Sequence, residues 1–307
     1  MPISTHAFTM ARRRFAIPTR KTVPRHEYAP PSRRRLKANP IALAALSFLL
    51  AIAAASLAAP LLSPYDPLEM SPADQFLPPS WEHPAGTDLF GRDVATRVLY
   101  GGRLSLGIGL LAVPIAAIPG TLLGLLAGYY GGVVDRLVSW LVDVMLAFPS
   151  ILLALTLIAV LGTGAANVVL AVGIAGIPQY ARLVRGQALS IRRHPYVRAA
   201  WTIGCTNTRI LLRHILPNVL GPIIVLATLD VGWAILNASA LSFLGLGVQP
   251  PTPEWGAMLN EGRGYLRNAP WVTAAPGLAI ALTVLSVNLL GDALRDSLDP
   301  RQRTQNR

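Results

Sequence analysis

Residues 144–181 read VMLAFPSILLALTLIAVLGTGAANVVLAVGIAGIPQYA, an uninterrupted run of 38 residues without a charged side chain. A helix rises about 1.5 Å per residue, so roughly 20 residues cross the ~30 Å hydrocarbon core of a bilayer, and this run has room for two crossings. Four shorter uncharged runs lie at 38–65, 104–134, 231–253 and 268–291. The chain is therefore predicted to be an all-α membrane protein that crosses the bilayer several times.

The composition excludes several classes of function. Only 14% of the 307 residues are charged, compared with about 25% in soluble proteins. The single cysteine, Cys205, rules out an intramolecular disulfide framework, and the five histidines are too scattered for a metal site. No glycine loop with a lysine is present to cradle a phosphate, because Lys21 and Lys37 are the only lysines. We therefore expect no catalytic residues, no metal and no cofactor bound by this chain.

The basic excess, a net charge of +12, indicates the topology. Ten of the 27 basic residues lie in residues 1–40 beside a single acid, Glu27, and this segment is predicted to be a disordered cytoplasmic tail. The segment 182–217 holds seven arginines and no acid, so the positive-inside rule places it in the cytoplasm as well. Orientation of the spans explains these charges more simply than nucleic-acid binding does.

Six transmembrane helices with both termini in the cytoplasm form the predicted architecture. The expected spans are 41–62, 104–127, 136–161, 165–183, 218–243 and 271–291. The other divisions are the tail 1–40, the extracytoplasmic connection 63–102, the core 103–293 with its cytoplasmic loop 184–217, and the cytoplasmic tail 294–307. The fourth span is short and interrupted by Gly173, Gly176 and Pro178, so a re-entrant segment there is the alternative.

Three glycines spaced four apart, Gly120, Gly124 and Gly128, fall in the second span. Small residues at this spacing let two helix backbones approach closely. This face is therefore predicted to pack on another helix.

The cytoplasmic loop carries the most informative spacing. Ala199 and Ala200 are followed by Gly204 and then by Leu216 and Pro217. This pattern resembles the EAA-type loop of importer permeases driven by ATP-binding-cassette (ABC) subunits, which reads Glu-Ala-Ala, three residues, Gly, nine residues, an apolar residue, one more, then Leu-Pro. Two positions depart from that pattern.

Arg198 stands in the glutamate position of the loop, and His214 stands in the apolar position. An arginine there would need an acidic partner or solvent, whereas a glutamate could pair with a basic group. The resemblance implies that this loop contacts the ATPase, through Arg198, Ala199, Ala200, Gly204, Leu216 and Pro217.

Further segments resemble the C-type permease subunit of dipeptide, oligopeptide, glutathione and nickel importers. They are Gly86-Thr87-Asp88 with Gly91-Arg92-Asp93, AGYYGG at 127–132, LAFPS at 146–150, ARLVR at 181–185, LSFLGLG at 241–247 and QPPTPEWG at 249–256. The likeness covers about residues 41–302. It implies a type I ABC importer permease fold and a multi-pass position in the bacterial inner membrane.

The resemblance also implies a function and a set of partners. The chain would be the permease subunit of an ATP-driven importer of peptides, with glutathione or nickel complexes as alternative substrates of the same machinery. Its partners would be a second homologous permease, two ABC ATPase subunits that hold ATP and Mg, an extracytoplasmic solute-binding protein, and membrane lipid. An ion-coupled secondary carrier and a membrane-embedded enzyme are the rival hypotheses, and neither the expected inverted repeat nor a catalytic pair is present in the sequence.

Two further groups of residues are candidates for function. Asp143 and Asp230 are the acids placed well inside predicted spans, where they line the pathway or pair within the bundle. The outside segments are the candidate docking surfaces for the binding protein. Their candidate residues are Gly86, Thr87, Asp88, Gly91, Arg92, Asp93, Glu254 and Trp255.

Overall fold

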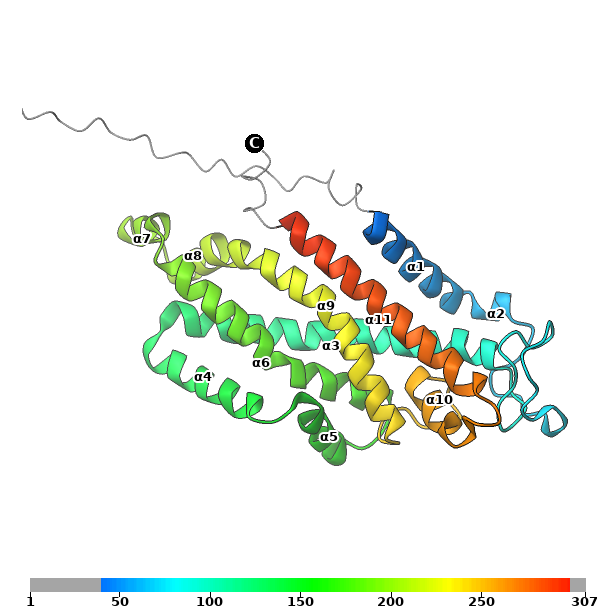
Figure 1. Ribbon diagram of the computed structural model, residues 1–307. Coiled ribbons are helices and arrows are strands. Elements are labelled where there is room, and N and C mark those ends of the chain that lie inside the picture. Colours follow the sequence, from blue (N-terminus) through cyan, green and yellow to red (C-terminus); the bar gives the residue numbers. More distant parts are fainter. Residues whose placement is uncertain (1–39, 299–307) are drawn as a thin grey trace, which may run out of the picture. The chain divides into compact units, whose positions relative to one another are not determined.

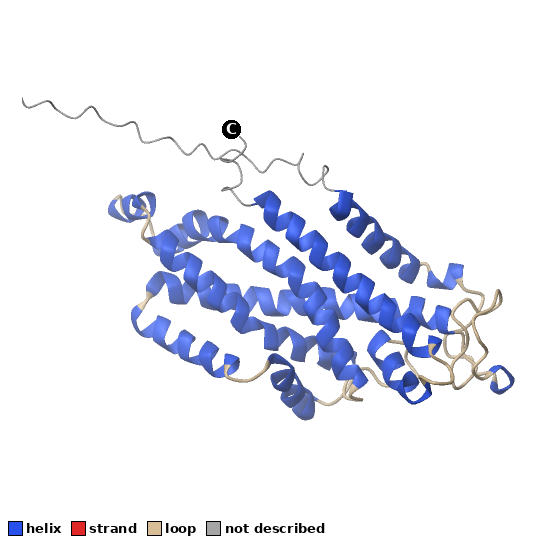
Figure 2. Ribbon diagram, viewed as in Figure 1, coloured by secondary structure: helices blue, strands red, loops and turns tan. Residues whose placement is uncertain are grey.

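The computed structural model describes residues 40–298. The predicted tail 1–40 lies outside the described residues except for Pro40, and the predicted tail 294–307 lies outside them from residue 299 on, because the last helix continues to Leu298. Figures 1 and 2 show that the described part is built from helices and connecting loops. Its helices are α1 (Pro40–Leu57), α2 (Ala59–Leu62), α3 (Val94–Tyr130), α4 (Gly132–Leu146), α5 (Ser150–Leu161), α6 (Ala165–Arg192), α7 (Pro195–Thr202), α8 (Asn207–Ile210), α9 (Leu216–Phe243), α10 (Trp255–Gly262) and α11 (Trp271–Leu298). Short 3₁₀ turns occupy Pro72–Asp74 and Arg263–Tyr265, and a π-helical turn occupies Leu211–Ile215.

Five of these helical segments are long and apolar enough to cross a membrane. They are α1, α3, α6, the continuous helix Asn207–Phe243, and α11. The pair α4 and α5 meets the same criterion as a sixth span, although it is bent by 90°. The predicted all-helical, multi-pass architecture is therefore confirmed.

The interruption lies in the third predicted span, 136–161, and not in the fourth. The bend follows Leu146, and α5 begins after Pro149, whose ring cannot continue the helical hydrogen bonds. The prediction of a weak fourth span was wrong, because α6 is one helix of 28 residues that contains Gly173, Gly176 and Pro178. A Cβ on Gly173 would lie 2.6 Å from Cγ2 of Ile115, so this glycine serves close packing against α3 and does not end the helix.

The core is formed by α3, α6 and α9. One buried cluster joins these helices to α5 through residues such as Ile108, Ala154, Val172 and Leu241. A second cluster, toward α7 and α8, contains Tyr180, Val184, Ile210 and Val219. Figure 1 shows that the loop 63–93 and α10 gather at one end of these helices, and α7 and α8 lie at the opposite end.

The glycine face of α3 packs directly on α6. A Cβ at Gly120 would lie 2.6 Å from the Ile177 carbonyl oxygen, and one at Gly124 would lie 2.6 Å from the Ala181 carbonyl oxygen. At Gly128 the nearest atom is the Cβ of Ala188, also at 2.6 Å. The prediction of a close helix contact at this spacing is confirmed.

Substituting Gly124→Val is expected to destabilise the protein by about 1–3 kcal/mol, because the added side chain must push the backbone of α6 away. Gly107→Val is the matched control, since a Cβ at Gly107 meets no atom within 4 Å. Thermal unfolding in detergent measures both variants. Equal midpoints for the two variants would contradict the packing role of Gly124.

Candidate functional site

The cytoplasmic loop folds into the short helix α7, which is seated on the inner end of α6. The chain turns after Arg192, and Pro195 occupies the first turn of α7, where its missing N–H has no helical partner to lose. Val197 and Ala200 point into the cluster that contains Ala188, Ile191 and other buried residues. The seating of α7 therefore depends on two small apolar side chains, and Ala200 is one of them.

The opposite face of α7 is open. Arg198, Ala199 and Thr202 are exposed there, and the side chain of Trp201 is 70% exposed. A large exposed indole and an exposed arginine on one short helix are typical of a surface that binds another protein. The alanine pair of the motif is thus divided, with Ala200 packed inside the chain and Ala199 on the outward face.

Gly204 ends α7 by adopting a positive φ of +85°. Its N–H donates to the Trp201 carbonyl oxygen at 3.0 Å, and the N–H of Cys205 donates to the Ala200 carbonyl oxygen at 3.0 Å. A side chain at this left-handed position would be strained, so the motif needs glycine for the turn.

Leu216 and Pro217 lie at the start of α9, where a π-helical turn changes to an α-helix. The helical path itself begins earlier, at Asn207. The Leu-Pro pair therefore marks a change of winding within one helix, and this irregular turn connects the loop to the span.

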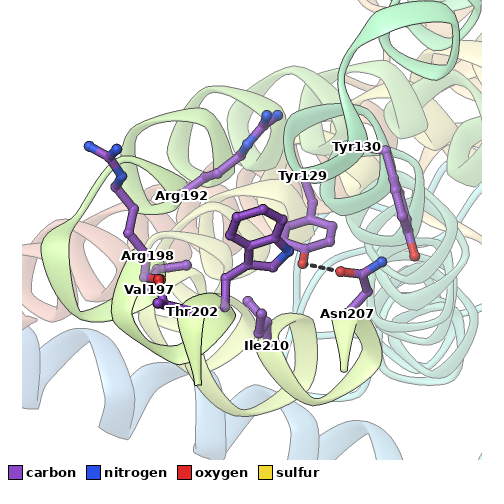
Figure 3. A pocket seen from close by; sticks show the side chains of 9 residues that line it. Tyr129, Tyr130, Arg192, Val197, Arg198, Thr202, Asn207 and Ile210 are labelled. Carbon is purple, nitrogen blue, oxygen red and sulfur yellow. Dashed lines mark hydrogen bonds between the residues drawn. The ribbon is translucent and has the colours of Figure 1, made fainter. Parts of the chain in front are cut away.

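A pocket of about 430 Å³ lies between α7 and the inner end of α3. It is lined by Tyr129, Tyr130, Arg192, Val197, Arg198, Trp201, Thr202, Asn207 and Ile210. The Tyr129 hydroxyl donates a hydrogen bond to Oδ1 of Asn207 at 2.7 Å, and Figure 3 shows these two side chains meeting in the pocket. This bond ties α3 to α8 and positions the pocket wall.

The pocket is aromatic and positively charged. Arg192 and Arg198 belong to a segment without acids, and neither takes part in an ion pair among residues 40–298. Unpaired guanidinium groups beside exposed aromatic rings are suited to a carboxylate supplied by another molecule.

At the other end of the helices, the predicted docking residues are buried and bind one another. Arg92 and Arg97 are only 2% and 1% exposed. Arg92 donates to Asp88 at 2.7 Å and to Glu261 at 2.7 Å, and Arg97 donates to Glu261 at 3.0 Å. Two arginines and two carboxylates thus form a neutral network that joins the loop 63–93 to α3 and α10.

The remaining members of the GTD and GRD motifs fix the loop. Asp93 caps α3 by accepting from the Thr96 N–H at 2.7 Å. Gly86 and Gly91 adopt positive φ values of +69° and +71°, and the Thr87 carbonyl oxygen accepts a bond from the Trp271 indole at 3.0 Å. These residues give the outside loop its shape, and the docking function of the segment stays a prediction.

Glu254 and Trp255 are buried in the same region. The Glu254 carboxylate caps α10, accepting from the N–H groups of Gly256 and Ala257 at 3.0 and 2.9 Å. It also accepts from the Ser105 hydroxyl at 3.0 Å, and the Trp255 indole donates to the Val98 carbonyl oxygen at 2.9 Å. Both side chains therefore fasten α10 to α3.

The two acids predicted inside spans have different surroundings. Asp230 on α9 is buried beside the hydroxyl of Tyr180 on α6. Asp143 on α4 is exposed and pairs with Arg182 of α6 at 2.9 Å. Asp230 therefore lies inside the helix bundle, and Asp143 lies on its surface.

Sequence reasoning missed several of these residues. Glu261 and Arg97 complete the outside network, and the only signal for Glu261 was its position as one of two acids, with Glu254, in the predicted outside loop 244–270. Tyr129, Tyr130 and Arg192 were not assigned to the cytoplasmic site because they precede the motif in the chain. The doubled tyrosine at the end of a glycine-lined span was the available signal.

Comparison with known proteins identifies the family. Residues 120–304 match the model for the binding-protein-dependent transport system inner membrane component, and residues 32–79 match the N-terminal TM domain of oligopeptide transport permease C. The chain is 48% identical over 271 residues to the dipeptide transport system permease protein DppC of Alkalihalophilus pseudofirmus, covering 88% of this chain and 89% of that protein. It is 48% identical over 285 residues to the glutathione transport system permease protein GsiD of Escherichia coli O157:H7, covering 92% and 93%.

Solved structures agree with the fold. A chain of the MetNI methionine ABC transporter, in inward-facing conformations, matches with a TM-score of 0.55 and 18% identity over 66% of this chain and 96% of that one. At this identity the likeness supports the fold of the helical core. The chain belongs to the family of binding-protein-dependent transport system inner membrane components and is a multi-pass permease of the inner membrane.

Proposed function

We propose that this chain is the permease subunit of an ATP-driven importer that moves peptides of the dipeptide class into the cytoplasm. Its relatives include permeases named for dipeptide and for glutathione transport. Peptide is the primary proposal, and glutathione, itself a tripeptide, is the second candidate because the GsiD proteins match at the same level of identity.

The energy for transport comes from separate ATPase subunits, which hold ATP and Mg. The observation that supports this step is the arrangement of α7, which packs on the core through Val197 and Ala200 and leaves Arg198, Ala199 and Trp201 exposed. An ATPase subunit bound to that outward face can move α7 as a lever, because α7 is joined to α6 on one side and to α9 on the other.

The side chains that line the pocket beside α7 determine which groups of the ATPase this surface can bind. Arg192 and Arg198 favour an acidic residue of the ATPase, and Trp201 supplies apolar contact area. A second permease subunit completes the pathway, and an extracytoplasmic binding protein delivers the peptide to the side of the loop 63–93.

Transport by the whole complex tests the function. Proteoliposomes that contain both permeases and both ATPases, with the binding protein outside, are expected to take up a labelled dipeptide only when ATP is supplied to the ATPase side. Uptake of glutathione in place of dipeptides would support the second candidate. Uptake of peptide by this chain alone, without any ATPase, would overturn the proposal.

Cross-linking tests the contact between α7 and the ATPase. In a Cys205→Ser background, Ala199→Cys is expected to form an adduct with the ATPase when the complex is treated with a short crosslinker that has one thiol-reactive end and one amine-reactive end. Ala200→Cys is the matched control and should give little adduct, because position 200 is only 6% exposed and faces the core of its own chain. If Ala199→Cys gave no adduct in a complex that still transported peptide, α7 would not be the contact.

A further inference from the structure

The outer end of the molecule has to meet a binding protein through residues other than those predicted from the sequence. The family is defined by transport that depends on a binding protein. The predicted docking residues are all buried, and Arg92 and Trp255, for example, are only 2% and 0% exposed. A contact with a second protein is therefore left to the exposed side chains of the two outer loops, 63–93 and 244–270.

Trp81 is the most exposed large apolar side chain at this end. Its exposed fraction is 101%, so the indole is as accessible as in an extended peptide. The turn that carries it is nevertheless fixed, because the Ser80 N–H donates to the His83 carbonyl oxygen at 2.9 Å and the Tyr65 hydroxyl donates to the Glu82 carbonyl oxygen at 3.2 Å. A large aromatic side chain on a fixed turn is suited to anchor a protein contact, since little backbone order remains to be gained on binding.

The exposed charges of the loop 63–93 are all acidic. Arg92 is the only arginine in this loop, which contains no lysine, and its side chain is buried in the network with Asp88. The fully exposed ionisable residues of the loop are Asp66, Glu69 and Glu82. This loop therefore presents a negatively charged surface around Trp81.

The second outer loop, 244–270, has the opposite arrangement. Its acids, Glu254 and Glu261, form hydrogen bonds within the chain, whereas its arginines, Arg263 and Arg267, are exposed. The buried network joins the two loops, and Figure 1 shows them gathered at the same end of the helices. The outer end thus has an acidic and a basic surface, and each has its opposite charges engaged inside the chain.

A lipid surface explains this arrangement less well than a protein does. Membrane-binding surfaces place lysine and arginine beside their aromatic side chains, because anionic headgroups attract basic residues. The charged neighbour of Trp81 is Glu82, and the other exposed charges of this loop are also acids. Charge complementarity therefore favours a protein with basic side chains as the partner of Trp81.

We propose that Trp81 anchors the binding protein on the outer end of this chain and that the two charged surfaces fix its orientation. The exposed acids of the loop 63–93 pair with lysine or arginine side chains of the binding protein, and Arg263 and Arg267 pair with its carboxylates. Contacts of both signs select one orientation, because a reversed binding protein would bring like charges together. The inference rests on the proposed importer function and names the surface that its binding protein uses.

Direct binding tests the anchor. The complex of both permeases and both ATPases is placed in nanodiscs, and the dissociation constant of the purified binding protein of the same transporter is measured by biolayer interferometry. Trp81→Ala is expected to raise this constant about tenfold or more. Leu61→Ala on α2, where leucine is 89% exposed, is the matched control and should leave the constant unchanged. The thermal midpoint of both variants should equal that of the parent, because neither side chain is packed.

Charge reversal tests the orientation. Glu69→Lys and Arg267→Glu are each expected to weaken binding severalfold at low salt and less at high salt. The double variant has the net charge of the parent, since one change adds two positive charges and the other removes two. It should bind more weakly than either single variant, because both contacts are then reversed. Asp296→Lys, exposed at the opposite end of α11, is the control for the change of charge alone and should have no effect.

Photo-crosslinking identifies the partner of position 81. With p-benzoylphenylalanine in place of Trp81, an adduct with the binding protein is expected when that protein is present. Adducts with lipid alone or with the second permease would overturn the inference, as would an unchanged dissociation constant for Trp81→Ala. Recovery of the parent affinity in the double charge variant would show that only net charge matters and would overturn the oriented contact. ATP-dependent uptake by the parent complex, measured separately, tests the proposed function independently of these results.

Discussion

Replacing Glu261 with glutamine is expected to destabilise the protein by about 3–5 kcal/mol, because it leaves two buried arginines with one carboxylate. Glu261 is the partner of Arg92 at 2.7 Å and of Arg97 at 3.0 Å, and its removal leaves only Asp88 to balance them. The effect is measured as a large fall in the midpoint of thermal unfolding in detergent. Proteolysis of the loop 63–93 should also be faster when a protease is added to the outer side of the membrane.

A double variant separates the effect of an unbalanced charge from the effect of losing one side chain. Arg97→Met with Glu261→Gln removes one positive and one negative charge together, so the remaining Asp88 and Arg92 stay balanced at 2.7 Å. This variant is expected to be more stable than Glu261→Gln alone. Glu82→Gln, an exposed acid in the same loop, is the control and should stay within about 0.5 kcal/mol of the parent. If Glu261→Gln destabilised the protein no more than Glu82→Gln does, the stabilising role of the buried network would be contradicted.

The spans could be predicted from sequence because hydrocarbon imposes a length and excludes charge. That argument located the helices, yet it assigned the break to the wrong span. Gly173 and Gly176 resemble helix breakers in isolation, but they are contact points for α3, and neighbouring helices decide which of the two roles a glycine has. Pro149, by contrast, lies where α4 turns into α5, and the 90° bend depends on the local backbone.

The two candidate sites also differ in how far they could be predicted from the sequence. The cytoplasmic motif could be found because its residues are close in sequence and form one short helix with its turn. The outside network joins Arg92 to Glu261, which are 169 positions apart, and no local pattern connects them. Loop acids such as Asp88 were expected at the surface because charge is usually solvated, whereas here each buried charge has an opposite partner.

Charge reversal at Arg198 is expected to reduce ATP-dependent uptake more than tenfold. Arg198 is exposed on α7 and borders the pocket that contains Arg192, and the described chain offers it no acidic partner. An acidic residue of the ATPase that pairs with it would face a like charge in Arg198→Glu, and removing one partner of a buried interfacial ion pair costs about 2–5 kcal/mol of binding free energy. Each 1.4 kcal/mol corresponds to about a tenfold change in affinity.

The measurement compares three quantities for the purified complex: uptake of peptide, ATP hydrolysis, and the amount of ATPase that copurifies with the permease. Arg209→Glu is the matched control, because it makes the same change of charge at an exposed position of the same loop outside the pocket. If anionic lipid were the partner of these arginines, both variants would lose transport to the same extent. A specific ATPase contact predicts a large loss for Arg198→Glu alone, and a basic substitution of the paired acid on the ATPase should restore transport, because it re-forms the ion pair with its charges exchanged.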